Sequence, residues 1–102
     1  MRGRGAERST VSRDFSTSLA GADDIALSLA ELARMQRLRA DFGLSEREAQ
    51  VATLIAQGRS KAAIARHLYV SENTVRTHAK NAYTKLGVRS KTELEGLLEG
   101  LA

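Results

Sequence analysis

The residues best suited to chemistry in this chain lie between Val70 and Leu86, where cationic and hydrogen-bonding side chains recur at helical spacing. They are Asn73, Arg76, Thr77, Lys80, Thr84 and Lys85. No carboxylate follows Glu72 in this stretch. Such a face offers hydrogen-bond donors and positive charge to a surface rich in acceptors and negative charge, and duplex DNA is the commonest surface of that kind.

The other face of the same stretch is apolar, which predicts an amphipathic helix over residues 72–86. Its apolar positions are Val75, Ala79, Ala82, Tyr83 and Leu86. Ser71 suits the N-cap, because its hydroxyl oxygen can accept from amides of the first turn. Gly87 suits the left-handed residue that ends a helix. An ordinary solvated surface helix can show the same pattern, so the neighbouring segments must decide between the two interpretations.

Composition narrows the class of protein. The chain has 102 residues and a net charge of +4, and residues 43–90 contain eight Lys and Arg against three Glu. Positive charge therefore gathers around the predicted helix, as phosphate binding requires. The chain has no Cys, and its two His have neither metal-ligand nor nucleophile spacing. We therefore predict no enzymatic activity, no cofactor and no metal site. No apolar run is long enough to span a membrane, so we expect a cytoplasmic protein without membrane contact from this segment.

Two segments precede the basic region. Residues 1–21 are rich in Arg, Gly, Ser and Thr and lack a sustained apolar period, which indicates a flexible basic tail or linker. Residues 22–41 favour a connector helix, with Asp23 and Asp24 in the first turn and Arg39 in the last. Apolar side chains occupy much of the surface of this helix, so another surface must pack against it. The C-terminal domain, a second copy of the chain, or an upstream domain could supply that surface.

Residues 42–102 predict a compact domain whose first helices have clear boundaries. Ser45 and Glu48 are spaced as a capping box that starts a helix, and Gly58 suits its end. Ser60 caps a short second helix over residues 61–68.

A tight turn at residues 68–70 connects this short helix to the basic amphipathic helix. Two helices joined in this way, the second with a basic polar face, form a helix-turn-helix. A second capping-box pattern, Ser90 with Glu93, begins a final helix. The sequence therefore predicts an all-α protein with four helices in residues 42–102. In this context, DNA binding is favoured over a merely solvated helix face.

Several motifs agree in order and spacing with one family. They are L-S-E-R-E at 44–48, the break at Gly58, I-A-R-H-L-Y-V-S-E-N-T-V-R-T-H at 64–78, and K-L-G-V-R-S at 85–90. Residues 42–102 thus resemble the LuxR-type (FixJ/GerE/NarL-like) helix-turn-helix domain. The resemblance implies sequence-specific binding of double-stranded DNA and regulation of transcription, in the manner of a response regulator output domain.

The resemblance also implies roles for individual side chains. Base contacts in the major groove are implied for Arg76, Thr77 and Lys80. Contacts with the phosphate backbone are implied for Ser60, Lys61, Asn73, Thr74 and Lys85. Arg76 can donate hydrogen bonds to both O6 and N7 of one guanine. Thr77 can contact a thymine methyl group or donate to an acceptor. A phosphate contact is the alternative role for Lys80.

Members of the family bind DNA as dimers through their last helix, which implies a homodimer on an operator with two half-sites. The leucines implied at this interface are Leu94, Leu97, Leu98 and Leu101. The same leucines could instead complete the core of the monomer. Both roles are compatible if Leu94 faces inward and either Leu98 or Leu101 faces outward.

Two other classes of protein remain open at this point. A sigma-factor region-4-like domain also contains a helix-turn-helix, and it recognises promoters as part of RNA polymerase. RNA polymerase is therefore a further possible partner of this chain. The closing leucine helix and the detailed motif match favour the LuxR type over it. A helical protein–protein adaptor would differ from both by lacking measurable DNA affinity even at low salt.

Overall fold

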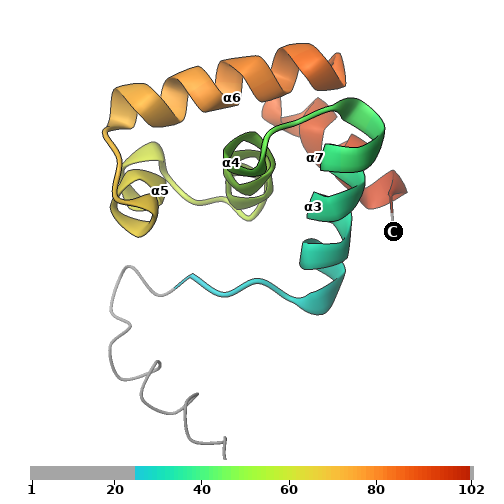
Figure 1. Ribbon diagram of the computed structural model, residues 1–102, viewed down its shortest axis with the longest axis horizontal. Coiled ribbons are helices and arrows are strands. Elements are labelled where there is room, and N and C mark those ends of the chain that lie inside the picture. Colours follow the sequence, from blue (N-terminus) through green and yellow to red (C-terminus); the bar gives the residue numbers. More distant parts are fainter. Residues whose placement is uncertain (1–24, 102) are drawn as a thin grey trace, which may run out of the picture.

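The computed structural model describes residues 25–101, which form five α-helices and no strand (Figure 1). The helices are α3 (Leu29–Phe42), α4 (Glu46–Ala56), α5 (Lys61–Leu68), α6 (Glu72–Leu86) and α7 (Lys91–Gly100). The predicted all-α class is confirmed, and α5 and α6 have the predicted bounds. The tail predicted for residues 1–21 lies outside the described residues.

Each of these helices begins after a serine whose hydroxyl oxygen accepts a hydrogen bond from the backbone N–H three residues later. These serines are Ser28, Ser45, Ser60, Ser71 and Ser90. The Glu48 carboxylate accepts from the Ser45 N–H at 2.9 Å, which confirms the first predicted capping box. The second box is only half formed, because Glu93 Oε1 accepts from the Arg89 N–H at 2.8 Å. Ser90 has a φ of −143°, well away from the −71° of Ser45. The Glu93 carboxylate therefore accepts from the N–H of Arg89 and not from that of Ser90.

The helix predicted over residues 22–41 is shorter in the structure and begins at Leu29. Residues 25–28 are not helical, because Ser28 and Glu31 form a capping box that starts the helix there. Its two hydrogen bonds measure 2.9 and 3.0 Å. The S-L-A-E sequence carries this signal, but it lies inside a run of Ala and Leu that favours helix throughout.

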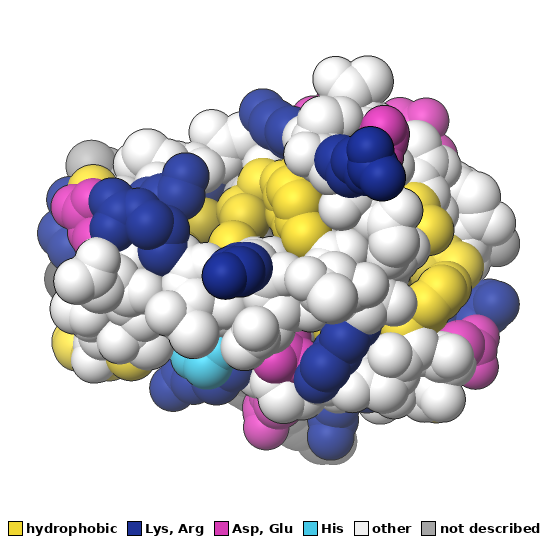
Figure 2. Space-filling view, turned by 90° about the horizontal axis from the view of Figure 1, so that it is seen from above, with side chains coloured by type: hydrophobic (Ala, Val, Ile, Leu, Met, Phe, Trp, Pro, Cys, Tyr) yellow, Lys and Arg dark blue, Asp and Glu magenta, His cyan; other side chains and the backbone are white. Residues whose placement is uncertain are grey.

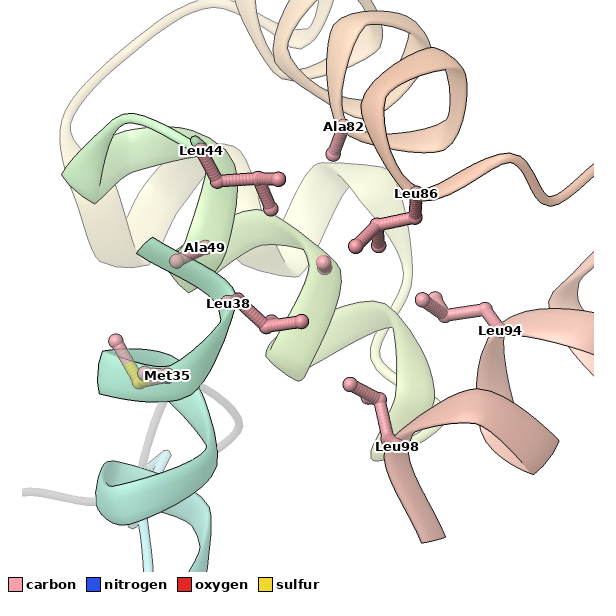
Figure 3. Packing of buried hydrophobic residues seen from close by; sticks show 9 residues of the cluster. Met35, Leu38, Leu44, Ala49, Ala82, Leu86, Leu94 and Leu98 are labelled. Carbon is pink, nitrogen blue, oxygen red and sulfur yellow. The ribbon is translucent and has the colours of Figure 1, made fainter. Parts of the chain in front are cut away.

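Helix α4 lies at the centre of the fold and contributes to two hydrophobic clusters. The first joins α3, α4, α6 and α7, and Figure 3 shows its leucines pointing toward one another from α3, α6, α7 and the connection between α3 and α4. The second joins α4 with α5 and α6, and contains Ile64 and Val75, both fully buried. Because α6 contributes to both clusters, its apolar face is held along much of its length.

Helix α3 packs on the C-terminal domain, the first of the three covers considered for it. Met35 and Leu38 are buried in the first cluster. Leu27, just before the helix, packs against both clusters. Leu29 at the start of α3 is 84% exposed, so part of its apolar surface stays open to solvent. None of the helices described here combines the length and apolar character needed to cross a bilayer.

Candidate nucleic-acid interface

Helix α6 presents two chemically distinct faces. Val75 and Ala82 are fully buried against the rest of the domain. Arg76, Thr77 and Lys80, the three predicted base contacts, are all exposed. In Figure 1 the helix lies along one outer edge of the molecule, and Figure 2 shows Lys and Arg side chains spread over that edge with few carboxylates among them. The structure therefore places the three predicted base contacts together on an accessible, cationic surface.

Arg76 is oriented by a neighbour one turn away. Its Nη1 donates to Asn73 Oδ1 at 2.7 Å, which restrains the guanidinium without using its remaining donors. Thr77 donates its hydroxyl proton to the Asn73 carbonyl at 3.1 Å, so its methyl group is the part left for an apolar contact. Lys80 forms no hydrogen bond or ion pair with any described residue through its ammonium group. Asn73, predicted as a phosphate contact, thus also orients Arg76.

The predicted phosphate contacts at the start of α5 are accessible. Ser60 and Lys61 are exposed. The Ser60 oxygen accepts from the Ala63 N–H at 3.1 Å, which leaves its O–H free to donate to an anion. Unpaired amides and the helix dipole also favour negative charge at a helix N-terminus. Thr74 is half-buried, and its oxygen accepts from the Ser71 hydroxyl at 3.0 Å.

Lys85, for which the resemblance implies a phosphate contact, also bonds two groups within the domain. Its Nζ donates to Glu48 Oε1 at 2.7 Å and to the Gly43 carbonyl at 3.3 Å. The Glu48 side chain is only 8% exposed, so its charge needs a partner. The hydrogen bond from Lys85, followed by that from the Ser45 N–H, holds the pKa of Glu48 below its ordinary value. Lys85 therefore joins the end of α6 to the start of α4.

The leucines of α7 face the monomer core more than expected. Leu94 is fully buried and Leu98 is 5% exposed, and both belong to the first hydrophobic cluster. The outward orientation considered for Leu98 is wrong, because the cluster that receives it also contains Leu38 of α3. Leu97 and Leu101 are half-buried at the edge of this cluster, so they alone of the four leucines remain partly accessible.

The assignment of roles from sequence missed two cations near α6. Arg59 and Lys91 line the same groove as Lys61, Arg76 and Lys80. Arg59 follows the turn at Gly58, and Lys91 is the first residue of α7. Their positions in the sequence could have indicated them, because Arg59 is adjacent to the predicted N-cap Ser60 and Lys91 to the predicted N-cap Ser90. Within residues 25–101, no group of three or more His, Asp or Glu is placed to hold a metal ion.

Comparison with known proteins gives a family match over the helix-turn-helix. The family described as bacterial regulatory proteins, luxR family, matches residues 43–97. The chain is 35% identical over 85 residues to Mb0914c of Mycobacterium bovis, whose name describes an HTH-type transcriptional regulator. That match covers 80% of this chain and 10% of the relative. No solved structure shows significant similarity to the chain.

Shorter matches to other regulators cover about half of the chain. The uncharacterized transcriptional regulatory protein YhcZ of Bacillus subtilis is 44% identical over 52 residues, which are 51% of this chain. The oxygen regulatory protein NreC of Staphylococcus aureus is 47% identical over 51 residues, which are 50% of this chain. Each match covers 24% of the relative. The chain therefore spans between a tenth and a quarter of the length of these curated relatives.

The family match confirms the resemblance drawn from the motifs. It covers more than half of the chain. The matched residues include α6, which carries the exposed cationic face, and α5, which precedes it. Together with the regulators among the relatives, it supports a role in DNA-binding transcription regulation. This chain belongs to the luxR family of bacterial regulatory proteins.

Proposed function

We propose that this chain binds double-stranded DNA sequence-specifically, with α6 in the major groove, and thereby regulates transcription. The exposed face of α6 carries this proposal, because it presents Arg76, Thr77 and Lys80 without a carboxylate between them. A major groove is wide enough to admit such a helix and displays a distinct pattern of donors and acceptors for each base pair.

The two kinds of contact have separate tasks in this proposal. Arg76, restrained by Asn73, bonds a guanine edge, and Thr77 offers its methyl group to a thymine. Ser60 and Lys61, at the start of α5, hold the phosphate backbone and fix the register of α6 in the groove. Lys80 has an uncommitted ammonium group and can contact either a base or a phosphate.

Selection from a pool of random duplexes tests this function directly. Residues 1–102 should enrich one sequence, and binding to it should weaken steeply as salt rises. Binding to unselected duplexes should be weaker by a large factor and similarly salt-dependent. An absence of measurable DNA affinity even at low salt would support the protein–protein adaptor instead.

A dimer on an operator with two half-sites forms the second part of the proposal. The partly accessible Leu97 and Leu101 support a contact along one edge of α7, with Leu94 and Leu98 remaining in each monomer core. A dimer of this kind should select a two-fold symmetric sequence with half-sites about one helical turn apart. Recovery of a single half-site bound by one chain would remove the dimer from the proposal.

The cellular setting follows from the same proposal. A regulator that reads duplex DNA acts in the bacterial cytoplasm, as an output domain that could also contact RNA polymerase. The luxR family match favours this over a sigma-factor region-4-like role. Occupancy of the selected duplex in the absence of polymerase would support the regulator, whereas strict dependence on polymerase would support the sigma-like role.

A further inference from the structure

A basic groove borders α6 on the side that faces the beginnings of α5 and α7. Its cationic lining comes from four parts of the chain, and no Asp or Glu lines it. The cations are Arg59 before α5, Lys61 in α5, Arg76 and Lys80 in α6, and Lys91 in α7. Figure 2 shows a hollow with hydrophobic side chains at its floor and Lys and Arg around it. Like charges lining one groove repel one another, and a bound polyanion would relieve that repulsion.

The Arg59 side chain is positioned by a series of hydrogen bonds through Gln57. Its Nε donates to Gln57 Oε1 at 3.1 Å. The Gln57 amide nitrogen donates in turn to the Ala26 carbonyl at 3.0 Å and to both Glu31 carboxylate oxygens at 3.1 Å. The two Nη groups of Arg59 form no hydrogen bond with a residue described in the structure. The guanidinium is therefore restrained at one edge and available at the other, and its planar fork matches the geometry of a phosphate.

Lys91 places a second cation beside the same turn. Gly58 immediately precedes Arg59 in the sequence. The Lys91 Nζ lies 3.9 Å from the position that a Cβ on Gly58 would occupy. The Lys91 side chain is 52% exposed, and its ion pair with Glu95 spans 3.8 Å, too long for a hydrogen bond. Such a loose, solvated pair is worth little and leaves the ammonium group able to bind another anion.

We propose that Arg59 and Lys91 bind backbone phosphates of the DNA strand that runs beside α6, with Gln57 as a positioning residue for Arg59. This inference rests on the proposed function of α6 and extends the DNA contact from the start of α5 to the start of α7. Both cations flank α6 and do not project from it, so they suit the backbone and not the base edges. They therefore add affinity and register without adding sequence information.

Salt titrations of the full chain on a selected and a random duplex test this inference. Arg59→Ala and Lys91→Ala should each weaken binding to both duplexes by the same factor. Each should also reduce the slope of log affinity against log salt by about 0.9, the value for one lost phosphate contact. Arg59→Lys and Lys91→Arg should retain the slope because they retain the charge. Arg39→Ala, an exposed position on α3 outside the groove, is the matched control and should leave the slope unchanged.

The positioning role of Gln57 needs a double-mutant cycle. Gln57→Ala should weaken binding in the wild-type background and have no further effect when combined with Arg59→Ala. An equal effect in both backgrounds would show that Gln57 contributes only to the fold, and would overturn its positioning role.

Unchanged slopes in both alanine variants would overturn the phosphate contacts, while a steep wild-type slope would preserve the proposed function. Loss of affinity for the selected duplex alone would also overturn them, because it would indicate base reading. A wild-type chain that binds neither duplex would instead refute the proposed function itself.

Discussion

At the scale of single residues, the proposed function assigns base reading to α6 and the anchoring of the DNA backbone to the start of α5. Arg76 is exposed on α6 and oriented by Asn73, whereas Lys61 stands at the start of α5. Arg76→Ala should cost about 1–3 kcal/mol on the selected duplex and relax the base preference at one position. Lys61→Ala, the matched comparison, should weaken all sequences alike and lower the salt slope by about one. Fluorescence anisotropy on a set of base-substituted duplexes measures both. An equal loss on selected and random DNA after Arg76→Ala would exclude base reading by Arg76.

The ion pair between the buried Glu48 and the partly exposed Lys85 makes the stability of the folded chain depend on pH. Lys85 lowers the pKa of Glu48 from its ordinary 4.5, so the charged carboxylate stabilises the folded state above that pH. This contribution is lost as the pH falls through the lowered pKa. Glu48→Gln retains an oxygen that can cap Ser45 but removes the charge. It should cost about 1–2 kcal/mol at pH 7, a modest value because Lys85 is 41% exposed.

Urea unfolding of the wild type and Glu48→Gln at pH 7 and at pH 3 provides the measurement. The difference between the two proteins should shrink on acidification, while effects of other carboxylates cancel in the comparison. A difference that stays constant between the two pH values would mean that the charge of Glu48 contributes nothing to stability.

At the scale of the elements, local signals predicted α5 and α6 well, and distant packing decided the rest. Serine caps and the glycine after α6 lie next to the boundaries they set, so the bounds of these helices could be predicted. The orientation of Leu98 depends on a cluster that includes α3, and no local pattern contains that information. The partner of Lys85 is likewise far away in sequence, so its bond with Glu48 could not be predicted from the local pattern of α6.

The packing of α3 on the domain leads to a prediction about stability. Leu38 is fully buried in the first cluster, whereas Leu29 on the same helix is largely exposed. Leu38→Ala should destabilise the chain by about 2–5 kcal/mol, because it removes buried apolar surface and leaves a cavity. Leu29→Ala should change stability by at most about 0.5 kcal/mol. Chemical denaturation of both variants distinguishes them, and equally small effects would show that α3 is not docked on the domain.

At the scale of the whole molecule, the arrangement of α3 and α7 restricts how two copies could meet. Leu94 and Leu98 already complete the monomer core with residues of α3, which leaves the edge formed by Leu97 and Leu101. A contact confined to one edge of a helix buries less surface than a continuous leucine stripe would, and the proposed dimer should therefore be weak in the absence of DNA. Binding of two chains to adjacent half-sites raises their local concentration and would stabilise the same contact.

We expect Leu97→Glu to separate formation of the proposed dimer from DNA reading. The variant should bind a single half-site with unchanged affinity, because Leu97 lies outside the groove beside α6. On a duplex with two half-sites it should lose the cooperative gain, because a carboxylate at the edge of α7 would be desolvated on contact with the second copy. Titrations of both duplexes, with sedimentation to count the bound chains, provide the comparison. The same loss on both duplexes would indicate a damaged fold, and no loss on either would exclude this edge of α7 as the interface.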